Sequence, residues 1–296
     1  IRGDQIRLNG VAQAIEVFGP GSFDHNNPGK AVVTASWTSG MSFDNSSGKL
    51  ECAGDAVAVS SPDRMTQDKI EAGRIKLTLA PGTGMTVKPG GEGAPSKSTE
   101  PNVLKAEAYG SVVERDGGFN ARITSERFVQ DAAAPDGRRR ETLQYLEGPT
   151  IIADNAAGTL DVPAAGKLVL VDKRGSSKVV SSGEALGTGP GEARGDTLFE
   201  WDGTLHAERK KGEMDMLRNV RLIHRGADDG QVTTLQCDHL TATARGSAAS
   251  DESALGGKTS LTSAVASGAV FATFGPANLP GQSRPVRKEL TADRVS

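Results

Sequence analysis

Apolar side chains recur at every second position through most of this chain. Val33, Ala35 and Trp37 alternate with polar or small residues in this way. The runs that share the pattern are residues 31–37, 49–59, 70–79, 168–171, 214–222 and 235–244. In a β-strand every second side chain lies on the same face, so this pattern gives each strand one buried face and one solvent-exposed face. Amphipathic stretches with the helical period of 3.6 and convincing length are absent, and the sequence therefore predicts an all-β protein.

Turn-forming residues separate these runs and suggest how the chain is divided. Ser46-Ser47-Gly48 and Asp116-Gly117-Gly118 are typical of tight turns between strands. Three longer segments, residues 81–101, 173–195 and 246–258, are rich in Gly, Pro or small polar residues and are expected to be loops.

The second of these loops divides the chain in two. We expect an N-terminal β-repeat half (residues 1–172), a flexible Gly- and Ser-rich loop (residues 173–195) and a C-terminal β-repeat half (residues 196–296) that continues the first.

The two halves resemble each other when the sequence is moved by 164 positions. Trp37 then falls on Trp201, Gly48 on Gly212, and Asp55 on Asn219 without a gap. Identities are few but residue classes match, which indicates an internal duplication. Because a single pair of short strands cannot bury its apolar face alone, repeated pairs are expected to stack on one another.

A shorter motif recurs within these halves and carries a family resemblance. Residues 216–222 (Met-Leu-Arg-Asn-Val-Arg-Leu) are followed by residues 235–240 (Leu-Gln-Cys-Asp-His-Leu). A similar pairing joins Gly110-Ser111-Val112 to residues 123–128, and Gly268-Ala269-Val270 to residues 290–295.

This recurrence resembles the OstA-like family of lipopolysaccharide-transport proteins, in which a Gly-Asn-Val strand precedes a strand ending in Ala-Asp-x-apolar. The resemblance covers most of residues 31–296 and is weakest from 147 to 194. The sequence departs from the family pattern at Arg218, where Gly is expected, and at Ser125 and Cys237, which replace Ala.

The resemblance implies a folded-over jelly-roll of stacked antiparallel strands, a "β-taco", with an apolar groove that shields acyl chains during outer-membrane biogenesis. It also implies a periplasmic location in a Gram-negative-type envelope, either free or tethered through a segment that precedes this sequence. The partners it implies are lipopolysaccharide or a related glycolipid, and other OstA-like domains that pair edge to edge as homo- or hetero-oligomers.

The groove that the resemblance implies would be lined by a defined set of the alternating apolar residues. The candidates are Trp37, Met41, Leu50, Ile70, Ile75, Ile123, Phe128, Trp201, Met214, Met216, Val220, Leu222, Leu235 and Leu240. A basic run, Arg138-Arg139-Arg140, is a candidate contact for lipid head groups or for a partner. The alternative is that the same apolar residues pack only against one another, which predicts a structural or assembly protein with a closed core that acts through its edges.

Composition and motifs argue against other functions. The net charge of −3 and the mixing of both signs do not suit nucleic-acid binding. Aromatic residues make up only 4 % of the chain, too few for a sugar-stacking protein or a glycosidase. His206, His224 and His239 do not have the spacing of a zinc site, and Cys52 and Cys237 are expected to be buried thiols. A Gly-x-Ser-x-Gly elbow is also lacking, so we expect no enzymatic activity, no cofactor and no metal.

Overall fold

The computed structural model describes residues 1–10, 13–26, 32–80, 103–111, 119–173, 195–227, 231–246, 259–276 and 288–295. These residues contain eighteen β-strands and no helix, so the predicted all-β class is confirmed. The three predicted loops, residues 81–101, 173–195 and 246–258, lie outside the described residues apart from some of their end residues.

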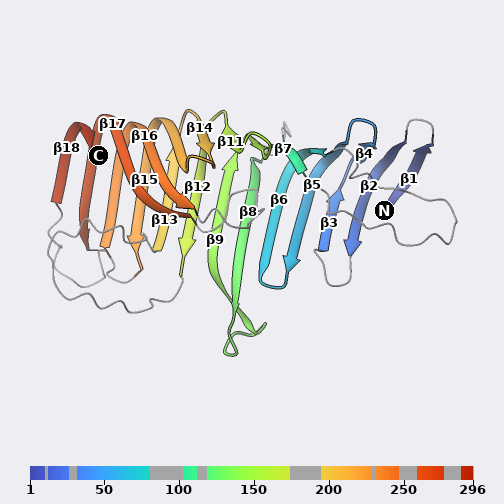
Figure 1. Cartoon of the computed structure of the whole chain (residues 1–296), viewed down its shortest axis with the longest axis horizontal. Coiled ribbons are helices and arrows are strands. Elements are labelled where there is room, and N and C mark those ends of the chain that lie inside the picture. The colour runs from blue at the N-terminus through green and yellow to red at the C-terminus, as the bar shows by residue number, and fades with distance from the viewer. Residues whose placement is uncertain are drawn as a thin grey trace.

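The strands follow one another along the molecule, with the N-terminal strand at one end and the C-terminal strand at the other (Figure 1). They are β1 (Arg2–Asn9), β2 (Ala14–Asn26), β3 (Val32–Trp37), β4 (Gly40–Asp44), β5 (Lys49–Asp63), β6 (Thr66–Leu79), β7 (Val103–Tyr109), β8 (Ala121–Gln130) and β9 (Arg138–Gly148). The second half contains β10 (Thr150–Asp154), β11 (Thr159–Val162), β12 (Gly166–Asp172), β13 (Gly195–Trp201), β14 (Leu205–Glu208), β15 (Glu213–Gly226), β16 (Gln231–Gly246), β17 (Thr259–Pro276) and β18 (Lys288–Val295).

Ten strands close into an antiparallel barrel. The pairings run from β6 through β8, β9, β12 and β13 to β15, and return through β14, β11, β10 and β7 to β6. The remaining strands extend this barrel, with β5, β4, β3, β2 and β1 on one side and β16, β17 and β18 on the other. Strands of the two predicted halves pair directly, through β12 with β13 and through β11 with β14.

The barrel and its extensions consist of two walls. Short strands belong to one wall each: β3, β8, β9, β12 and β13 to the first wall, and β4, β7, β10, β11 and β14 to the second. Long strands cross from one wall to the other. In β6, for example, residues 66–71 pair with β8 and residues 74–79 pair with β7.

The long strands change walls at corners made by an unusual backbone conformation. Gly54-Asp55 in β5 has φ values of 80° and 41°, and Arg218-Asn219 in β15 has values of 66° and 46°. Gly268-Ala269 in β17 repeats the arrangement with 73° and 43°. The strand register shifts at each of these pairs, as expected for a bulge that bends a strand. Two segments of the motif that recurs in the sequence, Arg218-Asn219 and Gly268-Ala269, therefore lie at corners of the fold.

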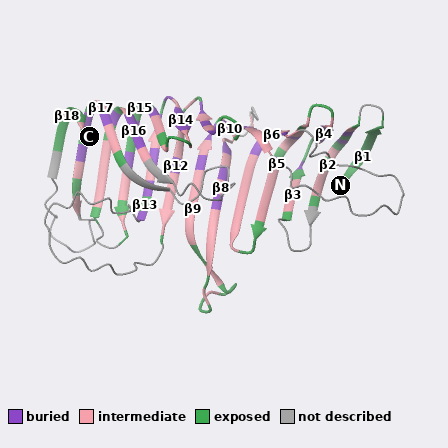
Figure 2. Cartoon of the chain, viewed as in Figure 1, coloured by how far each residue is buried: buried purple, intermediate pink, exposed green. Residues whose placement is uncertain are grey.

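The hydrophobic core follows the line of corners. Buried positions gather toward the edge of the molecule where the strands turn, and intermediate positions predominate along the rest of most strands (Figure 2). Two buried tryptophans occupy matching places in this core. Trp37 lies against Gly21 and Trp201 lies against Gly166, and a Cβ on either glycine would come within 2.7 Å of the indole ring. These shared surroundings support the duplication inferred from the shift of 164 positions.

Candidate functional site

The inner faces of the two walls carry rows of apolar side chains that the strand register places side by side. In the first wall, the inner residues nearest the corners form a floor row, which includes Trp37 and Trp201. The next inner residues, two positions further along each strand, form a middle row. The middle row consists of Phe23, Ala35, Ala58, Ile70, Ile123, Leu146, Leu168, Phe199, Leu222, Leu235, Ala272 and Leu290. Every member is apolar, so one continuous apolar stripe crosses twelve neighbouring strands.

The second wall has two matching rows on its inner face. Its floor row is Val17, Met41, Cys52, Ile75, Ala108, Ile151, Val162, Leu205, Met216, Leu240, Ala266 and Val295. Its middle row is Ile15, Phe43, Leu50, Leu77, Ala106, Ala153, Leu160, Ala207, Met214, Ala242 and Ala264. The two walls therefore present apolar surfaces on both sides of the interior.

Burial along the middle rows is uneven. Leu146 and Phe199, near the centre of the molecule, are completely buried. Toward the N-terminal end several members of the same rows are only partly buried, although Ile15 and Phe43 of the second middle row are buried, and we call the partly buried set the N-terminal trough. It comprises Phe23, Ala35, Ala58 and Ile70 of the first wall with Leu50, Leu77 and Ala106 of the second. The centre is thus a closed core, while the N-terminal trough keeps accessible apolar surface.

Most of the predicted lining residues lie in these rows. Trp37, Trp201 and Val220 belong to the first floor row, and Ile70, Ile123, Leu222 and Leu235 belong to the first middle row. Met41, Ile75, Met216 and Leu240 belong to the second floor row, and Leu50 and Met214 to the second middle row. Only Leu50, Ile70, Met214 and Leu235 of this set are partly exposed, and the others are buried.

Phe128 lies apart from the other candidates. The strand register shifts between Arg127 and Phe128, and the aromatic ring packs beneath the Arg138 guanidinium, 4.5 Å from its carbon to the ring centroid. Phe128 therefore belongs to the β8–β9 hairpin, which projects beyond the ends of the other strands (Figure 1).

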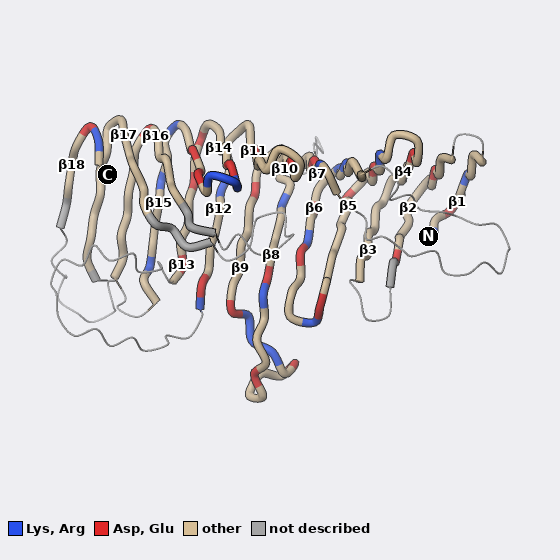
Figure 3. Tube along the Cα trace, in the orientation of Figure 1, with Lys and Arg blue, Asp and Glu red and all other residues tan. Residues whose placement is uncertain are grey.

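The basic run predicted to contact head groups lies on the same hairpin, where Figure 3 shows both signs of charge together. Each guanidinium pairs with a carboxylate of the hairpin itself. Arg138 contacts Asp136 at 3.0 Å, Arg139 contacts Asp131 at 3.3 Å, and Arg140 contacts Glu126 at 2.7 Å. These three arginines are thus partly neutralised by their own hairpin.

Sequence reasoning missed several inner residues. Phe199, Leu168 and Ile151 are buried in the rows, and the alternation Thr197-Phe199-Trp201 was a signal that could have found the first. The alanines that fill the second wall, such as Ala106 and Ala153, gave no comparable signal because Ala is common in every environment.

The histidines occupy two different faces. His224 is on the inner face, with its Nδ1 2.8 Å from the Thr197 hydroxyl. His206 and His239 are on the outer face of the second wall, beside Asp161 and Asp215 respectively. Within the described ranges, no group of three His, Cys, Asp or Glu side chains is arranged to hold a metal ion.

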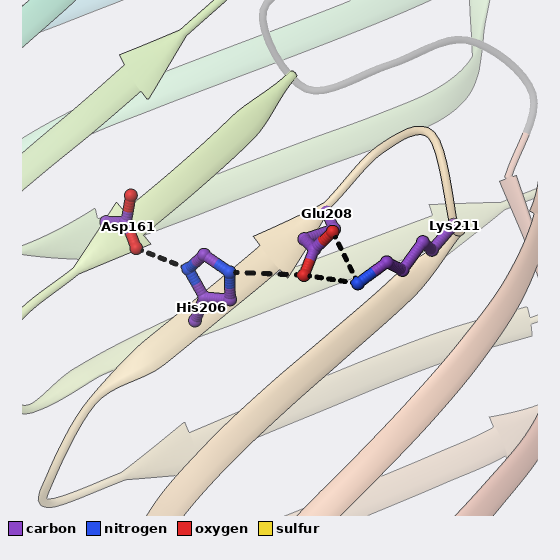
Figure 4. A network of polar contacts seen from close by, with 4 residues as sticks. All are labelled: Asp161, His206, Glu208 and Lys211. Atoms are coloured by element: carbon purple, nitrogen blue, oxygen red, sulfur yellow. Dashed lines mark hydrogen bonds and ion pairs between the residues drawn. The ribbon is translucent and has the colours of Figure 1, made fainter. Parts of the chain in front are cut away.

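The His206 network joins neighbouring strands on the outer face (Figure 4). His206 Nδ1 lies 2.5 Å from an Asp161 oxygen, and its Nε2 lies 3.8 Å from Glu208, which in turn binds Lys211. The hydrogen bond with Asp161 raises the pKa of His206, and the bond from Lys211 lowers the pKa of Glu208. The two cysteines are free and buried, and desolvation raises the pKa of Cys52 to about 12 and that of Cys237 to about 11. A thiol with so high a pKa is a poor nucleophile.

Comparison with known proteins identifies no relative. No protein-family model, curated protein or solved structure matches this chain. Within the residues that the structure describes, there is no helix of the length and apolar character needed to cross a membrane. The candidate site is therefore defined by its own geometry: two apolar walls that meet at a line of corners, with a closed centre and a partly open N-terminal trough.

Proposed function

We propose that this protein is a non-catalytic lipid carrier in which the two walls form a folded-over jelly-roll, the β-taco, around the acyl chains of a glycolipid. The observation that carries the proposal is the middle row of the first wall, which is apolar on twelve successive strands and remains partly exposed over β2, β3, β5 and β6. A soluble protein rarely keeps a continuous apolar surface open without a ligand or partner for it.

The energetics favour this role. Moving an acyl chain from water into an apolar groove gains about 0.8 kcal/mol for each methylene that is buried. The gain requires only a continuous apolar surface and no precise polar contacts, and the paired middle rows provide such a surface. The resemblance to the OstA-like family supports lipopolysaccharide or a related glycolipid as the cargo and the periplasm as the location.

Site-specific photocrosslinking tests the proposal. A benzophenone side chain placed at Ile70 or Leu77 faces the N-terminal trough, while one placed at the neighbouring Lys69 or Lys76 faces outward. We expect glycolipid adducts in cells from the two inner positions and few from the two outer positions. Adducts confined to protein at all four positions, or equal lipid labelling on both faces, would contradict the carrier proposal.

A second candidate is an assembly protein that works through its edges, and one observation favours it. Apolar side chains of the inner face are exposed at both ends of the molecule, with Ile6 and Leu8 on β1 and Leu290 on β18. In the described part of the chain, β1 pairs only with β2, and β18 pairs only with β17. Unpaired strand edges of this kind can pair with another chain by β-augmentation, and a carrier could use the same edges to extend its groove.

A further inference from the structure

The inner face of the first wall changes chemistry one step beyond the apolar middle row. The next inner residues form a rim row in which Ser60, Asp68, Ser125 and Gln144 are direct partners on β5, β6, β8 and β9. Leu170 interrupts the row, which resumes with Thr197, His224 and Thr233 on β13, β15 and β16. The register then continues through Phe274 to Lys288 at the C-terminal end of the molecule. The strand period of two keeps these polar side chains on the same face as Ile70 and Ile123, so they belong to the interior.

These polar groups are held within the protein. Ser125 and Thr197 are each only 7 % exposed, and the Thr197 hydroxyl lies 2.8 Å from His224 Nδ1. Burying a polar group costs free energy unless the group forms hydrogen bonds, so a polar row on an otherwise apolar face needs a structural or functional reason.

The second wall differs from the first beyond its middle row. Beyond its middle row the chain reaches hairpin turns, where Gly48, Gly158 and Gly212 lie, and the buried Leu79 is apolar. Polar side chains at this depth in the second wall, Asn45 with Gln13 and Asn155 with Arg209, lie in turns and bond to one another. The polar row carried by strands therefore belongs to the first wall, and it begins directly beside Ala58 and Ile70 of the N-terminal trough.

We propose that the rim row binds the polar end of a lipid whose acyl chain lies against the floor and middle rows, an inference that rests on the proposed carrier function. The groups bound are neutral hydrogen-bonding groups, either hydroxyls or amides. The row contains Ser, Gln, Thr and His side chains, which both donate and accept hydrogen bonds. Its acidic member is Asp68, and its members on β5, β6, β8 and β9, beside the N-terminal trough, include no Lys or Arg, so this part of the row suits hydroxyls and amides better than phosphate. The rim row thereby makes the carrier selective for acyl chains with a polar group near the head.

Two probe lipids that differ by one hydroxyl test the proposal: methyl tetradecanoate and methyl 3-hydroxytetradecanoate. Their affinities are compared by displacement of a fluorescent apolar dye from the purified full chain. A hydrogen bond formed in the interior contributes about 1 kcal/mol, so we expect the wild-type protein to prefer the hydroxylated ester about fivefold. The double variant Ser60→Ala, Ser125→Ala is expected to bind the plain ester as before and to lose that preference.

The matched control is Ser61→Ala, Thr124→Val, which changes the adjacent residues on the opposite face of the same strands. The control is expected to keep the preference, and circular dichroism verifies that both double variants are folded. Equal wild-type affinity for the two esters, or a preference that survives the rim substitutions, would overturn the rim proposal while leaving the carrier function intact. Failure of either ester to bind at all would instead overturn the carrier function on which this inference rests.

Discussion

At the residue scale, the two buried tryptophans differ in one hydrogen bond although their surroundings match. Trp201 Nε1 donates to the carbonyl oxygen of Ala164 at 2.9 Å, while the buried Nε1 of Trp37 has no acceptor within the described part of the chain. Replacing either by Phe removes similar ring volume, but only Trp201→Phe also leaves a carbonyl without its donor. We expect Trp201→Phe to lower the free energy of unfolding by about 1 kcal/mol more than Trp37→Phe does, measured by urea denaturation. Equal losses would show that the indole hydrogen bond contributes nothing.

At the element scale, the corners decide how a strand passes from one wall to the other, and Arg218 is the corner residue least suited to its backbone. Its φ of 66° lies in the left-handed region, which costs a residue with a Cβ roughly 1–2 kcal/mol. Gly54 holds the equivalent place in the first half with a φ of 80°. We expect Arg218→Gly to raise the free energy of unfolding by about 1 kcal/mol, part of the gain being offset by the greater entropy of the unfolded chain.

Two control variants complete this test. Gly54→Ala is expected to be destabilising, because a Cβ there would come within 2.2 Å of the Ser39 hydroxyl oxygen in addition to the backbone strain. Arg221 lies three residues beyond Arg218 in a regular part of β15 and forms an ion pair with Glu200, so Arg221→Gly is expected to be destabilising as well. Stabilisation by Arg221→Gly, or none by Arg218→Gly, would argue that the corner conformation is not the source of the effect.

At the scale of the whole molecule, the exposed inner residues at each end predict association through the edges. Ile6 and Leu8 are 44 % and 57 % exposed on β1, and Leu290 is 41 % exposed on β18. We expect the wild-type protein to form oligomers that grow with concentration in sedimentation velocity experiments. Leu8→Lys and Leu290→Lys should each reduce this association severalfold, because a charge on an edge strand disfavours pairing. Gln5→Lys, on the same strand as Leu8 but on its outer face, serves as the control and should have little effect.

The outcome separates the two candidate functions only together with the lipid content of the oligomers, because a carrier can use the same edges. A lipid-free ladder of oligomers that both inner substitutions abolish favours the assembly protein. A wild-type chain that stays monomeric at every concentration contradicts edge-to-edge association and leaves the carrier proposal to the crosslinking test.

The order of residues was enough to indicate the strand class and the internal duplication of this protein. Alternation with a period of two depends only on the order of residues, so Val33, Ala35 and Trp37 already indicated a strand with one buried face. The shift that aligns Trp37 with Trp201 also aligns Asp55 with Asn219, and these two residues lie at equivalent corners of the structure.

Which apolar residues stay accessible depends on the packing of the folded chain and not on the local sequence. Ile70 and Leu146 belong to the same middle row and have the same pattern in the sequence, yet one is partly exposed and the other completely buried. The difference depends on what the opposite wall and the neighbouring strands place against each side chain. A register shift likewise moved Phe128 out of the predicted lining, and the carboxylates of the β8–β9 hairpin paired with Arg138, Arg139 and Arg140. Burial and pairing are properties of residues distant in the chain that meet in space, and no local pattern records them.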